Sequence, residues 1–277
     1  MIDAHQHFWR LSRGDYPWPN PDVAPIFRDF GPDDLRPLLS RAGVTRTVLV
    51  QATDTVAETE WLLDLAKEFP VVAGVVGWVD LAAADAIATI DRLRADPLLK
   101  GLRPMLQNIA ETGWILRPEA QPALAHMAAV GLRFDALIQP RHLPVILTLA
   151  EAHPGLGIVV DHVAKPRMGQ GASPDADWVA GMRALAARPN VWCKLSGMIT
   201  EIGPDWRMKD LDPFARLVLT AFGPARCMFG SDWPVVNLAG DYQIWAETAL
   251  ALAAPLSAAD KESLFSGSAR EFYALEG

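Results

Sequence analysis

Short runs rich in β-branched residues alternate along the chain with longer segments of helical hydrophobic periodicity. This alternation is typical of repeated strand–helix units that build a parallel sheet. The short runs predict eight strands, over residues 2–7, 46–52, 71–78, 99–104, 132–138, 157–162, 190–195 and 226–230. The periodic segments predict helices over residues 33–42, 55–68, 83–95, 119–130, 143–152, 178–187 and 212–222.

The apolar character of the predicted strands favours a sheet that is covered on both faces. Residues 158–160, for example, are Ile-Val-Val without a polar position, as expected of a parallel strand under helices. Eight such units predict a single-domain (β/α)8 barrel, a TIM barrel, over residues 1–277. An open doubly wound sheet is the alternative, although no glycine-rich turn for a dinucleotide follows the first strand.

Composition narrows the class of protein. The 277 residues are 51% hydrophobic, enough for a large core, and 33 acidic against 25 basic residues give a formal net charge of -8. That charge would repel a phosphate backbone, so nucleic acid is not expected as a partner. The longest apolar run, near residues 71–79, is too short to span a bilayer. The chain also does not begin with positively charged residues followed by an apolar stretch, as a secretion signal would. We therefore expect a cytoplasmic enzyme and no membrane partner.

Two loops and two cysteines complete this outline. Residues 8–31 and 163–176 both follow predicted strands, which in a barrel places them over the functional face as candidate lids. Cys193 and Cys227 lie in or beside predicted strands, so we expect buried free thiols rather than a disulfide.

Histidine and aspartate residues cluster at predicted strand ends. His5 and His7 are two residues apart on the first strand, so both imidazoles should point to the same side. His162 ends the sixth strand and Asp232 follows the eighth, and in a barrel all these ends reach one rim. Asp232 could instead be a turn former or a helix cap. As a set, these side chains can hold a divalent ion, or polarise a carbonyl while the carboxylate takes a proton from water.

Further polar and aromatic residues near the same rim are candidate substrate contacts. Arg103 stands where the fourth strand would end, Lys194 ends the seventh strand, and Lys165 lies just beyond the sixth. For Arg103 a structural ion pair is the rival interpretation, whereas Lys165 and Lys194 could instead be solvated or support a site residue from behind. Trp78 and Trp233 also follow strands and could stack on a sugar ring or pack in the core. The absence of a Walker loop, a Gly-x-Ser-x-Gly elbow and a suitable cysteine favours activated water as the nucleophile.

Several short motifs follow one another along nearly the whole chain, in an order that matches a known family. They are His5-Gln6-His7, Gly101-Leu102-Arg103, Asp161-His162, Lys194-Leu195-Ser196-Gly197 and Gly230-Ser231-Asp232-Trp233-Pro234. In these motifs the sequence resembles the lactonase branch of the amidohydrolase superfamily, which includes pyrone-dicarboxylate and sugar-acid lactonases. The resemblance implies that Asp232 is the general base. It further implies that His5, His7 and His162 polarise the lactone carbonyl or contact an ion, and that Arg103 touches the substrate.

The chain also departs from that superfamily. The fourth strand lacks the bridging Lys or Glu of its binuclear members, and residues 132–139 lack their metal-binding histidine. Pro104 stands where many members of the branch place a histidine after Arg103. A binuclear centre is therefore not expected. The prediction is that no cofactor is strictly required and that one divalent ion, zinc or manganese, can bind at His5, His7, His162 and Asp232.

Together these observations predict a hydrolase that opens a small lactone, a neutral aldonolactone rather than a dicarboxylate, in carbohydrate catabolism. One alternative is a mononuclear metal-dependent hydrolase or decarboxylase of the same superfamily. A further alternative is a barrel that binds sugar acids without turnover.

Overall fold

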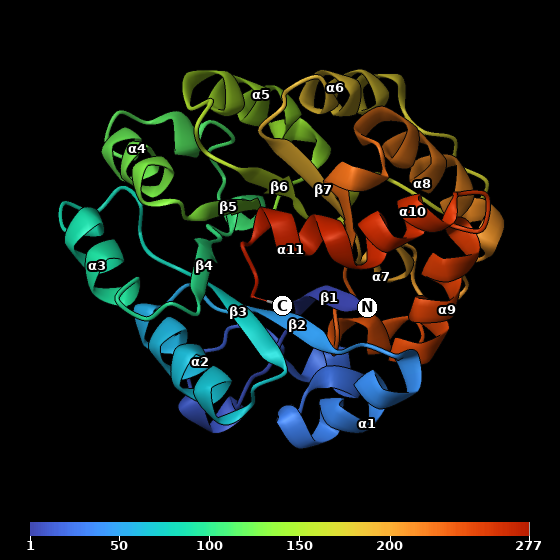
Figure 1. Cartoon of the computed structure of the whole chain (residues 1–277), viewed down its shortest axis with the longest axis horizontal. Helices are drawn as coiled ribbons and strands as arrows, with labels where there is room; N and C mark the ends of the chain where they lie inside the picture. Colours follow the sequence, from blue (N-terminus) through green and yellow to red (C-terminus); the bar gives the residue numbers. More distant parts are fainter. Residues whose placement is uncertain (277) are drawn as a thin grey trace.

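Eight parallel strands form the centre of the molecule in the computed structural model, which describes residues 1–276. Each strand pairs with the next one along the chain (Figure 1). The strands are β1 (Ile2–Gln6), β2 (Arg46–Val50), β3 (Val72–Gly77), β4 (Leu99–Leu102), β5 (Arg133–Ala136), β6 (Ile158–Val160), β7 (Val191–Leu195) and β8 (Cys227–Phe229). The predicted (β/α)8 barrel is thus confirmed, and each predicted strand is present with shorter bounds.

Helices surround this barrel as an outer layer (Figure 1). The longer ones are α1 (Pro32–Ala42), α2 (Val56–Glu68), α3 (Ala86–Leu93), α4 (Gln121–Val130), α5 (Leu143–Ala152), α6 (Ala176–Ala186), α8 (Met208–Phe222) and α9 (Tyr242–Leu252). Three short helices, α7 (Met198–Ile202), α10 (Ala258–Glu262) and α11 (Ser268–Phe272), complete the set. Among residues 1–276, no helix combines the length and apolar character needed to cross a membrane.

Helix boundaries differ from the predicted ones where capping decides them. Helix α8 begins at Met208, before the predicted start at residue 212, because the Asp210 carboxylate accepts a hydrogen bond from the backbone N–H of Arg207. This closes the first turn. Helix α3 is shorter than predicted, since residues before Ala86 form turns. Helix α9 was not predicted at all, although Asp241 caps its start.

The barrel closes between its first and last strands at the carboxyl ends. The backbone N–H of Asp232 donates to the carbonyl of His5 (2.8 Å), and that of His7 donates to the carbonyl of Trp233 (2.7 Å). The Asp3 carboxylate reinforces the seam by accepting from the backbone N–H groups of His5 and Ser231. Closure therefore brings the two histidines of β1 next to the aspartate that follows β8.

The opposite, amino-terminal end of the barrel is filled by apolar side chains. Ile2, Val48, Val76, Val159 and Met228 pack there with residues of the C-terminal segment, including Phe272 and Tyr273. Figure 1 shows α11 crossing the centre of the ring, with both chain ends beside it.

Candidate active site

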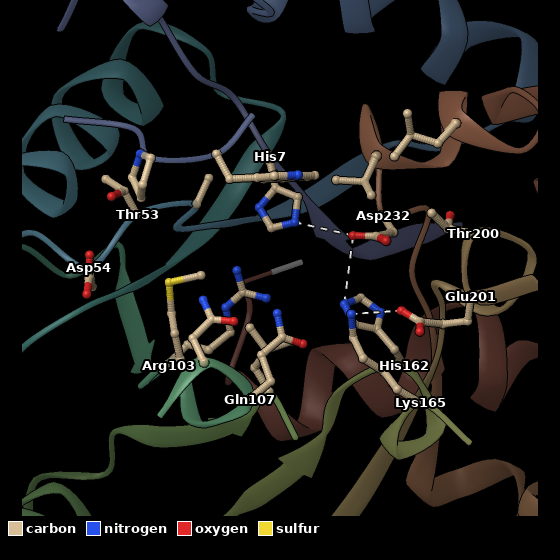
Figure 2. A pocket seen from close by; sticks show the side chains of 18 residues that line it. His7, Thr53, Asp54, Arg103, Gln107, His162, Lys165, Thr200, Glu201 and Asp232 are labelled. Atoms are coloured by element: carbon tan, nitrogen blue, oxygen red, sulfur yellow. Dashed lines mark hydrogen bonds and ion pairs between the residues drawn. The ribbon is translucent and has the colours of Figure 1, made fainter. Parts of the chain in front are cut away.

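A cavity of about 440 Å³ opens at the carboxyl ends of the strands (Figure 2). His7, His162 and Asp232 lie on its wall. The remaining lining residues come from the loops after the strands: Pro17, Trp18, Ala52, Thr53, Asp54, Arg103, Met105, Gln107, Asn108, Leu137, Lys165, Thr200, Glu201, Val235 and Leu238. Enzymes of this fold place their reacting groups at this end.

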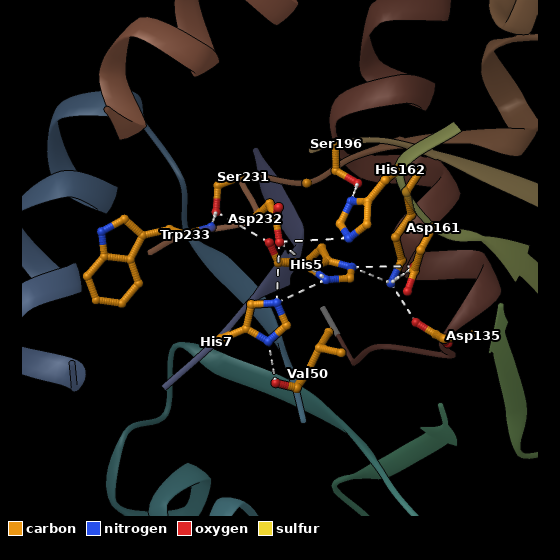
Figure 3. A network of polar contacts seen from close by, with 12 residues as sticks. His5, His7, Val50, Asp135, Asp161, His162, Ser196, Ser231, Asp232 and Trp233 are labelled. Atoms are coloured by element: carbon orange, nitrogen blue, oxygen red, sulfur yellow. Dashed lines mark hydrogen bonds and ion pairs between the residues drawn. The ribbon is translucent and has the colours of Figure 1, made fainter. Parts of the chain in front are cut away.

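Three imidazoles surround the carboxylate of Asp232 at the base of the cavity (Figure 3). Its Oδ1 atom lies 3.3 Å from Nε2 of His7, 3.7 Å from Nε2 of His5 and 3.8 Å from Nε2 of His162. All four side chains are at least nine-tenths buried. The convergence that the strand positions predicted is therefore present.

Polar contacts behind His7 and His5 hold the two rings in place. Nδ1 of His7 lies 2.8 Å from the carbonyl oxygen of Val50, so this nitrogen carries the proton and Nε2 keeps its lone pair. Each ring nitrogen of His5 lies beside a buried cation: Nδ1 is 3.1 Å from Nζ of Lys194, and Nε2 is 3.3 Å from Nη1 of Arg103. Nε2 of His5 also lies 3.2 Å from Nε2 of His7. His5 thus connects the buried cations to His7 and Asp232.

Burial sets the charges of these groups. Burial lowers the pKa of His162 to about 4, with the Asp232 carboxylate opposing the shift, and burial together with Lys194 holds the pKa of His5 well below its usual value. Burial by itself would raise the pKa of Asp232, but the contacts with His162 and His7 outweigh it and lower that pKa. At neutral pH the site therefore holds the ionised carboxylate of Asp232 beside the neutral imidazoles of His5 and His162.

The backbone around His162 is strained. His162, Val163, Ala164 and Lys165 have φ values of 51°, 49°, 62° and 49°, a left-handed run that costs L-residues about 1–2 kcal/mol each. The turn directs both His162 and Lys165 to the cavity. A Cβ atom on Gly197 would lie 2.6 Å from Nδ1 of His162, so only glycine leaves room for this imidazole. Such strain is typical of a functional position.

A charged network lies beneath the histidines, inside the barrel. Lys194 is fully buried, and its Nζ atom lies 2.5 Å from Asp135 and 3.1 Å from Asp161. Tyr273 donates from its hydroxyl to Asp135 at 2.6 Å. Arg103 contacts Asp161 at 3.4 Å. Because each charge has an opposite partner, the network can be accommodated in the low-dielectric interior.

The same atoms meet the requirements of a divalent ion. One nitrogen each from His5 and His7 and an oxygen of Asp232 lie within 4.8 Å of one another, as do ligand atoms of His5, Asp161 and His162. Nε2 of His7 and Oδ1 of Asp232 are both acceptors at 3.3 Å, and a cation or a proton between them would satisfy both. Imidazole and carboxylate are ligands that zinc prefers.

The family model described as "Amidohydrolase" matches residues 2–275, almost the whole chain. This chain belongs to the amidohydrolase family. The fold, the histidine pair on β1 and the aspartate after β8 agree with the resemblance seen in the sequence.

Relatives of this amidohydrolase include two proteins named L-fucono-1,5-lactonase. One, from Burkholderia ambifaria, is 50% identical over 247 residues, covering 88% of this chain and 84% of the relative. The other, from Burkholderia multivorans, is 36% identical over 99% of this chain and 96% of the relative. A crystal structure of an amidohydrolase from Burkholderia multivorans with bound zinc superimposes with a TM-score of 0.93, at 37% identity and 99% coverage of both chains.

The predicted substrate contacts of the amidohydrolase lie at different depths. Arg103 and Lys165 line the cavity, and Lys165 forms an ion pair with Glu201 at 2.8 Å. Lys194 lies below the cavity, against His5. Trp78 and Trp233 are not among the lining residues, and the ring of Trp233 packs edge to face on Phe8 and Phe30.

The aromatic side chain on the cavity wall is instead Trp18, from the loop over residues 8–31. This loop is tied to the exit of β2 by Glu58, which accepts hydrogen bonds from the Tyr16 hydroxyl and from the backbone N–H groups of Ala52 and Thr53. Burial raises the pKa of Glu58 to about 7. The loop could be predicted from the sequence but its anchor could not, because Glu58 has the sequence position of an ordinary first-turn acid of α2.

Proposed function

We propose that this amidohydrolase hydrolyses a small lactone, namely a neutral aldonolactone. The observation that carries the proposal is the ionised Asp232 carboxylate among neutral imidazoles at the base of a cavity. The names of the two lactonase relatives support the same reaction class. The cavity volume of about 440 Å³ suits a single sugar ring.

Asp232 is the proposed general base. A water molecule held by its carboxylate attacks the lactone carbonyl carbon, and Asp232 takes the proton that this water loses. The N–H groups of His5 and His162 stabilise the resulting oxyanion. The ring C–O bond then breaks, and the leaving oxygen takes the proton back from Asp232. The products are a carboxylic acid and a hydroxyl group in one open-chain molecule, so atoms and charges balance.

The charges on the cavity wall favour a neutral ring over an acidic one. Lys165 is already paired with Glu201, and Arg103 is engaged below the surface with Asp161. Asp54 adds a third carboxylate to the wall, besides Asp232 and Glu201. A lactone that carries its own carboxylate would meet these acids without a free cation to bind it, whereas sugar hydroxyls can donate to them.

We propose further that a divalent ion can bind here but that catalysis does not strictly require it. His5, His7 and Asp232 would hold such an ion, and the ion would supply Lewis-acid polarisation of a carbonyl. A lactone carbonyl is already electrophilic, and hydrogen bonds from imidazole N–H groups beside Asp232 can stabilise the oxyanion without an ion. The expected result is that protein dialysed against a strong chelator, and free of metal by elemental analysis, keeps most of its lactonase activity.

The opposite result would favour the second candidate, a mononuclear metal-dependent hydrolase or decarboxylase. The convergence of imidazole nitrogens on Asp232 is the observation behind it. Activity that disappears on dialysis and returns only with stoichiometric zinc or manganese would overturn the metal-independent mechanism.

The pH profile tests the charge assignment. Since the pKa of His162 is lowered to about 4, this imidazole stays neutral far below the usual histidine value of roughly 6.5. We expect kcat/KM to stay near its neutral value until the pH approaches 4, and then to fall as His162 gains a proton and pairs with the base. Circular dichroism at each pH is the control for unfolding. A fall centred near the usual histidine value would contradict the assignment.

A screen of sugar lactones with a pH indicator tests the proposed function directly. Each ring opening releases a proton, and parallel runs with and without chelator report the metal requirement at once. Neutral aldonolactones should react faster than lactones with an additional carboxylate. If no lactone releases acid while ligands still bind, the protein is a binding barrel and the proposal fails.

A further inference from the structure

A second cavity, of about 320 Å³, lies at the amino-terminal end of the barrel. Its wall is made by residues at or just before the starts of β5, β6 and β7 and by α11, the helix that crosses the centre of Figure 1. The lining residues are Arg133, Pro154, Gly155, Gly157, Pro189, Asn190, Trp192, Glu271 and Phe272. The proposed chemistry takes place at the opposite end and uses none of them.

Arg133 brings a positive charge to this cavity without a countercharge. Its Nε donates to the backbone carbonyl of Phe272, and among residues 1–276 no carboxylate lies within 4.0 Å of its guanidinium. Burial lowers the pKa of Arg133, with Tyr273 opposing the shift. A partly desolvated guanidinium without an anion is unfavourable, and its two terminal nitrogens form a fork that matches a carboxylate.

Trp192 lies on the same wall as Arg133, and its indole N–H is enclosed by the protein. Its Nε1 atom is buried, and no hydrogen-bond partner for it exists in the described part of the chain. Its ring packs on Phe272 with centroids 5.0 Å apart, and the Arg133 guanidinium carbon lies 5.6 Å from the same Phe272 ring. Arg133 on β5 and Trp192 on β7, the strands on either side of β6, therefore flank one aromatic ring and border the same cavity.

The space beside Arg133 and Phe272 depends on a glycine. A Cβ atom on Gly157 would lie 3.0 Å from Cδ of Arg133, 3.2 Å from the Phe272 ring and 3.3 Å from Nη1 of Arg133. Any other residue would crowd the guanidinium and the ring. Gly157 has no positive φ value, so the backbone conformation does not demand glycine here, and a Cβ atom would act by displacing the Arg133 side chain and the Phe272 ring.

We propose that this cavity binds a small hydroxycarboxylate. The carboxylate oxygens accept from the two terminal nitrogens of Arg133, and the Trp192 indole lies beside them on the same wall. Glu271, an exposed carboxylate on the same wall, repels a plain dianion but accepts a hydrogen bond from a hydroxyl group next to the bound carboxylate. The chemical class is that of an open-chain sugar acid, and the site itself does not depend on the reaction proposed above.

The test uses gluconate as the probe and the indole N–H signals of the tryptophans as the readout, in two-dimensional ¹H–¹⁵N NMR of the full chain. The Trp192→Phe variant identifies the Trp192 signal by its loss and keeps the aromatic packing. On titration with gluconate, the Trp192 signal should shift saturably. Sorbitol, which carries the hydroxyls but no carboxylate, should not shift it.

Matched variants then measure each contact by calorimetry in an Asp232→Asn background. Arg133→Gln removes a charge-assisted contact and should weaken binding at this site roughly ten- to hundredfold. Trp192→Phe keeps an aromatic ring beside Phe272 and should weaken binding less than Arg133→Gln does, whereas Gly157→Ala should fill the space and weaken it. Arg183→Gln, on the exposed face of α6, is the control and should bind like the parent.

Turnover separates this site from the active site. In the otherwise native chain, Arg133→Gln should keep its lactonase kcat, because Arg133 does not touch the catalytic cavity. A Trp192 signal that does not respond to gluconate, or an Arg133→Gln variant that binds as tightly as the Arg183→Gln control, would overturn the proposal. Both results are independent of whether any lactone is hydrolysed.

Discussion

Replacing Asp232 by asparagine should remove most lactonase activity while the protein still folds. An amide cannot accept a proton from water at neutral pH, and loss of a general base typically costs about 10²- to 10⁴-fold in rate. The side chain keeps its shape, and Asp232 has a φ of 56°, a left-handed conformation that asparagine tolerates well. The measurement is kcat on the best neutral aldonolactone, with thermal unfolding as the test of folding.

Asp54→Asn is the matched control for this variant. Asp54 lies on the wall of the same cavity, so both variants remove one carboxylate from the substrate's surroundings. Asp54 has no histidine partner among the ion pairs of residues 1–276, and its loss should alter KM more than kcat. If Asp232→Asn retains near-native kcat, Asp232 is not the base.

The residues that could be predicted from sequence are those placed by strand ends. His5, His7, His162 and Asp232 meet because a closed parallel barrel brings the ends of its first, sixth and eighth strands to one rim. The spacing of two between His5 and His7 survives an irregular register of β1 against β2 between Asp3 and Gln6. The two-residue period of a strand and the topology of the barrel were therefore sufficient to predict that these four side chains meet.

Side chains beyond the last strand residue were harder to predict. Trp233 follows Asp232 directly, but the positive φ of Asp232 redirects the chain, and the indole packs against Phe8 rather than lining the cavity. The alternation of side-chain directions along a strand does not predict where a side chain points beyond the end of that strand. Trp18 was missed as an individual residue for a related reason, since its place depends on how a long loop is anchored at Glu58.

The buried charges under the site were also missed. Asp135 lies in a predicted strand and Asp161 directly precedes His162, yet neither was singled out as functional. A lone acid in an apolar strand signals a buried partner, but only the three-dimensional register shows that the partner of Asp135 is Lys194, which also contacts Asp161. Lys194 itself was predicted as a substrate contact, and the structure places it below the cavity.

The Lys194 network supports the second large expected effect, this time on stability. Lys194→Met preserves length and apolar volume but leaves Asp135 fully buried without its cation, and Asp161 keeps only the 3.4 Å contact with Arg103 and the nearby His5. Removing one partner of a buried pair typically costs about 3–5 kcal/mol. We expect the free energy of unfolding, measured in urea at neutral pH, to fall by an amount in that range.

The double variant Lys194→Met with Asp135→Asn separates charge from packing. It removes the uncompensated carboxylate. In the native chain the Tyr273 hydroxyl donates to Asp135 at 2.6 Å, and the amide oxygen of the variant can still accept this hydrogen bond. The double variant should therefore be more stable than Lys194→Met alone, a non-additivity that marks direct coupling. Lowering the pH should reduce the difference in stability between the two variants, because protonation of Asp135 in the single variant removes the same charge. If the two variants unfold at the same urea concentration at every pH, the loss of stability comes from packing, and Lys194 does not stabilise the barrel through its charge.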